Sequence, residues 1–346
     1  MVEKNFVISN LIVGKNYPSL VIPEIGINHS GNIEKAFNLV DSAKRAGAKI
    51  IKHQTHIFDD EMSIEAKKVI PGNSKKNIYE IIKNCSLNEE EEYKLFLYVK
   101  KKKMVFLSTP FSYKAVDRLI KFKVPAFKIG SGEFHNTQFI EYVAKFKKPM
   151  ILSTGMNNMD HIKKVYNMLK KIKTNFCFMH TTSVYPTPDK LVRLDCINLM
   201  KKNFPDIIIG YSDHSVSSIA CESALSMRAL IIEKHFTDTK SRKGPDIVCS
   251  IDEKGLRNLI NRSITIFSQF RGKKNLLNEE IVTKNFAFTS VVSNGFIKKG
   301  EKLSKKNLVL KRPGNGHFNL NNLKFLQGKV AKKDIPENTQ IKKNHI

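Results

Sequence analysis

The sequence has no tryptophan, five cysteines and no long apolar run. A membrane-spanning helix needs about eighteen or more consecutive apolar residues, so none is expected. The N-terminal stretch carries charges and lacks the apolar core and cleavage site of a signal peptide. The cysteines are scattered, odd in number and never at C-x-x-C spacing, which argues against a disulfide framework or a zinc knuckle. These features fit a cytoplasmic protein that does not enter a membrane.

Acidic residues are also scarce. There are 32 Asp and Glu against 59 Lys and Arg, giving a net charge of +27 and a pI near 9.8. Such a balance is typical of nucleic-acid-binding proteins. The lysines are spread along the chain, however, and no zinc-finger or RNP motif is present. We therefore expect no nucleic-acid partner, and we keep a basic binding protein that uses its fold only as a scaffold as the alternative from another functional class. The positive field would help to collect a small anionic substrate.

Eight short apolar runs alternate with segments of helical periodicity, such as 33–46, 137–146 and 159–172. The runs are 19–25, 49–52, 104–108, 125–129, 149–153, 176–181, 206–211 and 229–234. Eight strands alternating with helices predict an α/β fold, a closed (β/α)8 TIM barrel over about 20–270. An open doubly wound sheet is the alternative, but no G-x-G-x-x-G follows the first run.

The character of the sequence changes at residue 271. The stretch 271–285 is polar and reads as a linker. Beyond it, 286–346 holds short β-like pieces at 286–293, 308–314 and 328–335, separated by glycine-containing turns. We therefore predict a barrel domain over 1–270 with an N-terminal extension, a linker over 271–285, and a small β-rich domain over 286–346.

Polar residues follow the predicted strands where a barrel of this class carries its chemistry. Two lysines and three hydroxyls, together with backbone amides freed by glycine, would suit a phosphate and a carboxylate bound side by side. They are Lys52, Lys128, Thr109, Ser131 and Ser153. Taken singly, either lysine also fits a solvated strand end.

Two histidines, His214 and His235, end the last two predicted strands, which are neighbours in a closed barrel. Neutral imidazoles there would suit Mn²⁺, Fe²⁺ or Zn²⁺, and hydrogen-bonded histidines without a metal are the alternative. Three carboxylates, Glu24, Glu133 and Asp246, are candidates for acid–base work or for holding a substrate hydroxyl. Structural ion pairs with nearby lysines are the other explanation for them.

Several motifs resemble those of the bacterial sialic acid synthases, the N-acetylneuraminate synthases that condense phosphoenolpyruvate with N-acetylmannosamine. They include PEIGINHSG (23–31), IKHQTH (51–56), LSTPFS (107–112), KIGSGE (128–133), YPTP (185–188), SDHS (212–215), EKHFTD (233–238), GPDIVCS (244–250) and KRPGNG (311–316). The resemblance runs from about residue 20 to the end of the chain. It implies a barrel followed by an antifreeze-like (SAF) domain, in a domain-swapped homodimer where the small domain of one chain caps the barrel of the other.

The resemblance also implies roles for individual residues. Phosphoenolpyruvate would be held by Lys52, Thr109, Lys128, Ser131, Ser153 and Ser183, and the sugar by Gln54, Asn73, Glu133, Tyr185 and the partner chain's counterpart of Arg312. His214 and His235 would bind a divalent metal, Mn²⁺ first, with Mg²⁺ or Co²⁺ as alternatives. Glu24 would handle the proton of the reacting water, with Asp246, which also faces the sugar, as second candidate.

Two points stay open within the resemblance. Close bacterial relatives tend to carry Asn where this chain has Ser183, and the shorter side chain lacks an amide donor, so the contacts to the phosphate would either differ or be bridged by a water. The sugar is the second point. KHQTH favours N-acetylmannosamine, and a 6-deoxy-diacetamido hexose, giving a legionaminic- or pseudaminic-type acid, is the alternative.

Overall fold

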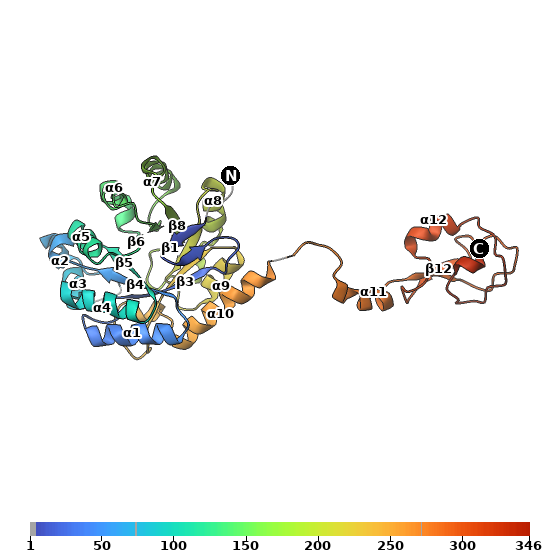
Figure 1. The fold of residues 1–346 in the computed structure, drawn as a ribbon, viewed down its shortest axis with the longest axis horizontal. Coiled ribbons are helices and arrows are strands. Elements are labelled where there is room, and N and C mark those ends of the chain that lie inside the picture. The colour runs from blue at the N-terminus through green and yellow to red at the C-terminus, as the bar shows by residue number, and fades with distance from the viewer. Residues whose placement is uncertain (1–4, 73–74, 271) are drawn as a thin grey trace. The chain divides into compact units, whose positions relative to one another are not determined.

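The computed structural model describes residues 5–72, 75–270 and 272–346, and the chain divides into two compact units, 1–271 and 272–346. The first unit is built on a closed parallel barrel with the strand order β10-β3-β4-β5-β6-β7-β8-β9, surrounded by helices (Figure 1). The predicted TIM barrel is therefore confirmed and the open sheet is excluded. Among the described residues, no helix is long and apolar enough to cross a membrane.

Each barrel strand falls on one of the eight predicted runs. The strands are β3 (Leu20–Gly26), β4 (Ile50–Thr55), β5 (Val105–Pro110), β6 (Phe127–Ile129), β7 (Met150–Ser153), β8 (Phe176–Thr181), β9 (Ile209–Asp213) and β10 (Ile231–His235). The surrounding helices are α1 (Ile33–Arg45), α4 (Glu89–Lys101), α5 (Tyr113–Lys121), α6 (Thr137–Ala144), α7 (Met159–Ile172), α8 (Asp195–Asn203), α9 (Ile219–Ser226) and α10 (Glu253–Gln269).

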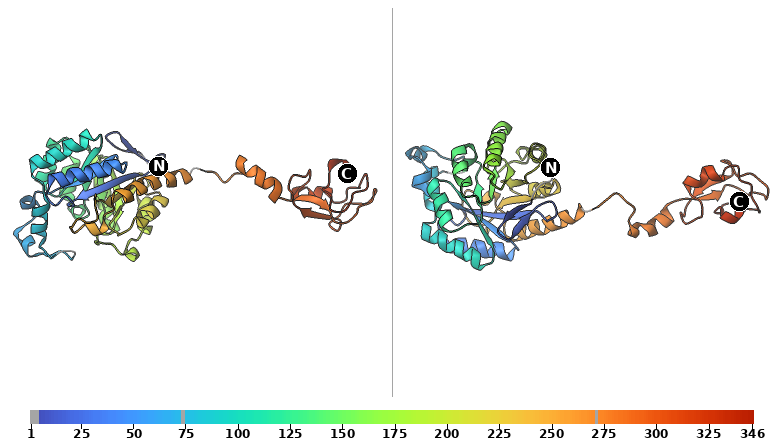
Figure 2. Two further views of the ribbon diagram at one scale, coloured as in Figure 1. Left: turned by 90° about the horizontal axis from the view of Figure 1, so that it is seen from below. Right: turned by 45° about the horizontal axis from the view of Figure 1, so that its top comes forward.

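The long connection between β4 and α4 has helical structure of its own. It contains α2 (Phe58–Glu61), a 3-10 turn (Ile64–Lys68) and α3 (Ile78–Cys85). In the left view of Figure 2 this blue-to-cyan segment projects from the edge of the barrel unit.

Short polar side chains begin most of the barrel helices. Asn32, Ser112, Asn136, Asn158 and Asp252 each accept a hydrogen bond from a backbone amide of the first turn. Such a cap satisfies one of the amide groups that a helix start leaves without an intrahelical partner. These caps hold each helix start, and so the loop before it, close to the carboxyl end of the preceding strand.

The barrel interior is apolar at one end and polar at the other. Ile22, Ile50, Val105, Leu107 and Ile231 fill the amino-terminal half of the barrel. That end is closed by a hairpin of β1 (Phe6–Ile8) and β2 (Leu11–Val13), whose Phe6, Ile8 and Val13 join the same apolar cluster. This hairpin was not expected from the sequence. The amino-terminal end of the barrel is thus closed by apolar side chains, and the polar interior lies at the carboxyl end.

The second unit has its own small core, which includes Val291, Ile297, Leu308, Phe318 and Ile341. Its regular elements are 3-10 turns at Asn278–Glu280, Leu320–Asn322 and Lys343–His345, helices α11 (Ile281–Ala287) and α12 (Leu323–Leu326), and the antiparallel pair β11 (Ser290–Ser293) and β12 (Leu308–Lys311). The β-like prediction for 286–293 is wrong in its first half, where α11 ends. The piece at 328–335 makes isolated bridges, Lys302 to Val330 and Ile297 to Ile335.

Candidate active site

The carboxyl ends of the barrel strands enclose a cavity of about 280 Å³. Most of the predicted site residues line it: Lys52, Gln54, Thr109, Lys128, Ser131, Glu133, Ser153, Ser183, Tyr185, His214 and His235. Glu24 lies beside it, bonded to Lys52, and Asp246 lines an adjoining cavity. Asn73 lies outside the described residues. Arg312 belongs to the second unit, where it is exposed just after β12.

A buried cluster of two lysines and two carboxylates forms the floor of the cavity. Lys52 pairs with Glu24, and its Nζ is 3.7 Å from Oε1 of Glu233. The Nζ of Lys128 lies 3.6 Å from Oε2 of Glu233 and donates a 2.7 Å hydrogen bond to Oγ of Ser153. Buried charges are costly unless they are paired. Here each ammonium has a carboxylate partner and still borders the cavity, so both remain available to an anionic ligand.

The two carboxylates of this cluster titrate differently. Burial and the nearby charge of Glu233 raise the pKa of Glu24 to about 7, against the opposing effect of Lys52. Burial also acts to raise the pKa of Glu233, but the ammonium groups of Lys128 and Lys52 outweigh it and bring that pKa below its usual value. Near neutral pH, Glu24 can therefore exchange a proton while Glu233 stays ionised.

Hydroxyl groups above the floor face a space kept open by a glycine. Among the described residues, Oγ1 of Thr109 and Oγ of Ser183 are buried without a hydrogen-bond partner. A Cβ at Gly155 would lie 2.4 Å from Oγ of Ser183 and 2.8 Å from Oγ of Ser131. Buried hydroxyls normally have partners. The orphaned hydroxyl of Ser183 lies beside the space that Gly155 leaves free, and the orphaned hydroxyl of Thr109 belongs to the same cavity. Together they indicate a cradle for a ligand with acceptor oxygens.

The two histidines lie side by side at the mouth. Their ring centroids are 5.4 Å apart. Nδ1 of His214 is 2.9 Å from the carbonyl oxygen of Thr182, which leaves its Nε2 available. Burial lowers the pKa of His214 to about 4 and that of His235 well below its usual value. Both rings are thus neutral near pH 7, the form that binds metal.

The histidine pair fits a divalent metal with an open coordination sphere. Within the described ranges, no group of three or more His, Cys, Asp or Glu side chains converges as a complete metal cage. Nδ1 of buried His235 has no hydrogen-bond partner there, and Oδ2 of Asp246 is 3.8 Å from it. An ion held by the two imidazoles alone would leave positions for water or substrate oxygens.

A fully buried ion pair is formed by the two residues that immediately precede the histidines in the sequence. Lys234 and Asp213 are register partners on β10 and β9, and Nζ of Lys234 is 2.6 Å from Oδ2 of Asp213. Tyr211 and Ser215 also donate to this carboxylate. Because strand side chains alternate, the residues that follow, His214 and His235, point into the barrel.

A second cavity of about 530 Å³ shares Gln54, Phe111, Glu133, Tyr185 and His235 with the first. Most of its remaining lining is apolar, namely Ile27, Met62, Pro71, Ile78, Ile81, Ile82 and Pro245, and the polar residues there are His56, Glu61 and Asp246. Burial raises the pKa of Glu133 to about 6 and that of Asp246 to about 6. The mouth is therefore divided into a charged inner compartment and a less polar outer one that carries two weakly acidic carboxyls.

Two residues of the site had no role predicted from the sequence. Ser212 and Glu233 line the inner cavity and hydrogen-bond to each other, with Oγ of Ser212 3.1 Å from Oε1 of Glu233. Each precedes a predicted metal histidine by two positions on the same strand. Side chains two apart in a strand share a face, so this spacing was the available signal.

A parallel eight-stranded barrel with buried charges, orphaned hydroxyls and a histidine pair at its carboxyl end belongs to the class of TIM-barrel enzymes. Comparison with known proteins gives the family. The model of the NeuB family matches residues 39–275, and that of the SAF domain matches residues 288–346. The chain belongs to the NeuB family of sialic-acid-type synthases, as the resemblance predicted.

The relatives differ in the acid that they make. An uncharacterized protein of Methanocaldococcus jannaschii is 37% identical, over 89% of this chain and 89% of its own. The N,N'-diacetyllegionaminic acid synthase of Campylobacter jejuni is 34% identical, over 94% of this chain and 99% of its own. The crystal structure of the N-acetylneuraminic acid synthetase of Leptospira borgpetersenii, in complex with citrate, matches with a TM-score of 0.75 and 27% identity over 81% of this chain and 95% of that one.

Proposed function

We propose that this protein condenses phosphoenolpyruvate with the aldehyde form of an N-acetylated hexose and with water, giving a 2-keto acid of the sialic acid type and phosphate. N-acetylmannosamine, which would give N-acetylneuraminate, is the first candidate sugar. The observation that carries the proposal is the pair of buried ammonium groups, Lys52 and Lys128, beneath orphaned hydroxyls in the inner cavity. Such a floor suits a small molecule with a carboxylate and a phosphate.

Phosphoenolpyruvate would occupy the inner compartment. Lys128, Ser153 and Lys52 would hold its anionic groups, and the unpartnered hydroxyls of Thr109 and Ser183 would donate to its oxygens. These groups are fixed by strand ends, so they would be in place before negative charge builds up on the departing phosphate. The sugar would lie in the outer compartment, between Gln54, Glu133 and Tyr185.

A divalent metal, Mn²⁺ in the first instance, would be held by His214 and His235 and would supply Lewis-acid polarisation of the sugar aldehyde. The support is the two buried, neutral imidazoles, one anchored through Nδ1 and the other with Nδ1 unpartnered among the described residues. Nδ1 of His214 contacts the carbonyl of Thr182, and such a second contact fixes the orientation of a ligating ring.

The bond changes balance with these residues and the departing phosphate as proton carriers. The methylene carbon of phosphoenolpyruvate bonds to the aldehyde carbon, and the aldehyde oxygen takes a proton to become a hydroxyl. Asp246 or Glu133, with pKa values of about 6, can give that proton. Water adds to C2, and Glu24, with a pKa of about 7, takes the proton of that water. The bond between C2 and the phosphate oxygen then breaks, the proton of the new C2 hydroxyl passes to the departing phosphate, and the 2-keto acid and hydrogen phosphate remain.

A 6-deoxy-diacetamido hexose is the second candidate sugar. Two observations favour it: the Campylobacter relative is named for a diacetyllegionaminic acid, and the outer compartment has an apolar wall that includes Ile27, Ile78 and Ile82. A methyl at C6 and a second acetamido methyl would bury apolar surface there. The KHQTH motif at 52–56 favours N-acetylmannosamine.

The test is phosphate release from phosphoenolpyruvate by chelator-stripped protein, with each sugar, with and without Mn²⁺. Release that needs metal and N-acetylmannosamine supports the first candidate, and release only with the diacetamido sugar supports the second. Lys128→Met should abolish release, whereas Lys145→Met, which removes an exposed lysine, should not change it. Absence of release with both sugars in the presence of Mn²⁺ would overturn the proposal.

We also propose that the active form is a domain-swapped homodimer in the cytoplasm, in which the second unit of one chain brings Arg312 to the other chain's barrel. Support comes from large apolar side chains exposed on each unit, such as Met156 (72%) and Ile219 (70%) on the barrel and Phe288 (58%) on the second unit. Mixing inactive Arg312→Ala and Lys128→Met chains should restore about a quarter of the wild-type rate, because half of the dimers are mixed and carry one intact site. A barrel served by its own second unit would show no recovery.

A further inference from the structure

The amino-terminal end of the barrel, opposite the active site, carries a cavity of about 750 Å³ whose charged lining is entirely basic. Lys49, Lys100, Lys103 and Lys123 line it, and its walls include Phe96, Met104 and Pro125. Lys49 and Met104 immediately precede β4 and β5, which places the cavity at the closed end of the barrel. Among the described residues lining it there is no Asp or Glu.

These lysines differ from many others in the barrel in having no carboxylate partner. Lys94, Lys102, Lys114, Lys121 and Lys170 each form an ion pair. Within the described ranges, none of the four cavity lysines does, and Lys100 instead lies over the ring of Phe96 at 5.2 Å. Four uncompensated positive charges around one hollow produce a local potential that favours a ligand with several negative charges.

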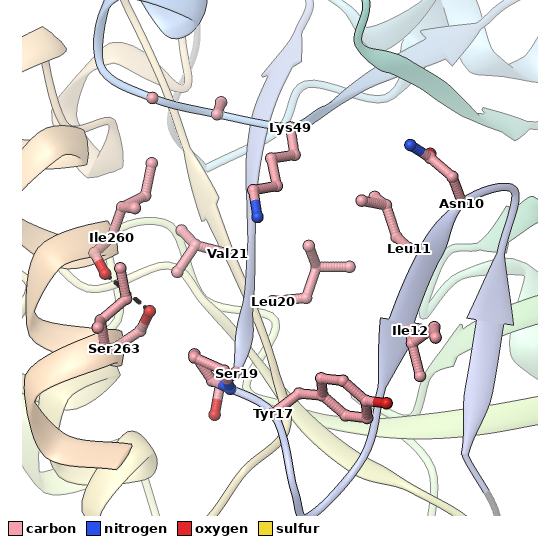
Figure 3. Close-up of a pocket in the computed structure, with 14 residues that line it drawn as sticks. Asn10, Leu11, Ile12, Tyr17, Ser19, Leu20, Val21, Lys49, Ile260 and Ser263 are labelled. Atoms are coloured by element: carbon pink, nitrogen blue, oxygen red, sulfur yellow. Dashed lines mark hydrogen bonds between the residues drawn. The ribbon is translucent and has the colours of Figure 1, made fainter. Parts of the chain in front are cut away.

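A neighbouring cavity of about 340 Å³ shares Asn10, Leu11 and Lys49 with the basic one. Figure 3 shows Lys49 extending between β2 on one side and Ile260 and Ser263 of α10 on the other, with Tyr17 at the edge. Apart from Lys49, no charged residue of the described chain lines this second cavity, and its walls are mostly apolar. The basic cavity and the mostly apolar cavity are therefore adjacent and share part of their lining.

We propose that these adjoining cavities form a binding site for a ligand that carries a phosphate chain, of the class of a nucleoside triphosphate. Four lysines match the charge of a triphosphate, whereas a monophosphate would leave about half of their charge uncompensated. The nucleoside would lie in the apolar cavity, where Tyr17 offers an aromatic face. The site is independent of the proposed function, because it lies at the other end of the strands from the active-site mouth and shares no lining residue with it.

The backbone offers a way to remove two of the charges without disturbing the fold. Lys103 and Lys123 have φ angles of 55° and 61°, in the left-handed region where asparagine is tolerated better than lysine. Lys147 and Lys173, after α6 and α7, have the same conformation with φ of 55° and 61°, and they do not line either cavity. The double changes Lys103→Asn/Lys123→Asn and Lys147→Asn/Lys173→Asn therefore remove equal charge from equivalent backbone positions.

The experiment is calorimetric titration of the full-length protein with the four ribonucleoside triphosphates, their monophosphates and tripolyphosphate, at about 0.15 M salt, where distant charges are screened. We expect triphosphates to bind, and monophosphates to bind more weakly. Lys103→Asn/Lys123→Asn should weaken triphosphate binding by about tenfold or more, and Lys147→Asn/Lys173→Asn by less than about twofold. Tyr17→Ser should weaken nucleotides but not tripolyphosphate.

The outcomes separate the two sources of a phosphate chain. Tighter binding of nucleotides than of tripolyphosphate, lost in Tyr17→Ser, supports the nucleotide. Equal affinity for both would leave the lysine site standing and overturn the nucleoside part. Equal weakening by the two double changes would show that only the overall charge matters and would overturn the site, as would no binding of any probe.

Discussion

Replacing Lys234 with methionine tests whether the strand ends that carry the two histidines depend on a buried ion pair. Lys234 and Asp213 both have 0% exposed side chains, and their charged atoms are 2.6 Å apart. Removing one partner of a buried pair costs about 3–5 kcal/mol, because the other charge stays buried without compensation. Tyr211 and Ser215 would still donate three hydrogen bonds to Asp213. We therefore expect the lower end of that range, about 3 kcal/mol.

The assay is urea unfolding at pH 7, followed by circular dichroism. Wild type, Lys234→Met, Asp213→Asn and the double variant form a cycle, and the two single losses should fail to add by about 2 kcal/mol. Lys94→Met is the control, because Lys94 pairs with Glu90 at the surface, where the side chains are 58% and 78% exposed. It should cost less than about 0.5 kcal/mol.

A loss below about 1 kcal/mol for Lys234→Met, or single effects that simply add, would mean that the buried pair contributes no more to stability than a surface contact, contrary to this prediction. A second readout addresses the site itself. Because His214 and His235 directly follow the pair in sequence, Mn²⁺ binding measured by calorimetry should weaken in Lys234→Met and stay unchanged in the control.

Three further predictions follow from single sites. Burial raises the pKa of Glu24 to about 7, so a rate that needs the ionised carboxylate should rise with pH through about 7. The variant Glu24→Gln should lose that rise. An unchanged pH profile in the variant would exclude Glu24 as the base. Gly155→Ala would place a Cβ within 2.8 Å of two serine hydroxyls and should raise KM for phosphoenolpyruvate about tenfold. Gly272→Ala, which adds a Cβ with nothing within 4 Å and does not line the cavity, should leave KM unchanged. Phe6→Ala should cost about 3–5 kcal/mol in urea unfolding, because Phe6 closes the barrel bottom. Val7→Ala, at a 40% exposed position, should cost less than about 0.5 kcal/mol. Equal losses of unfolding free energy in the two variants would contradict a role of the β1–β2 hairpin in closing the barrel.

Much of the barrel could be predicted because its signals are local. A buried parallel strand needs a short apolar run, and an amphipathic helix needs its own spacing, so strands such as β7 and helices such as α7 follow from neighbouring residues. The hairpin of β1 and β2 was missed because each strand is only three residues long. Residues 286–289 were misjudged because aromatic residues suit a strand and the end of a short helix alike.

The candidate site, like the fold, could be predicted from the sequence only where its signals are local. Residues that end strands, such as Thr109, Ser153 and His235, were expected at one mouth because a closed barrel brings all its strand ends together. Glu233 received no role because its importance depends on Lys52 and Lys128, which approach it from other strands. The residues next to Glu233 in the sequence give no information on those distances.

The eight barrel strands and the polar side chains at their carboxyl ends could be assigned from the sequence, since periodicity and strand termination are properties of adjacent residues. The pairing of those side chains depends on the tertiary structure. Closure sets β10 beside β3, bringing the floor together from residues about 200 apart in sequence, and burial then gives Glu24 a pKa of about 7 and Glu233 a lowered one. Protonation depends on desolvation and on charges a few ångströms away, and those exist only once the chain has folded.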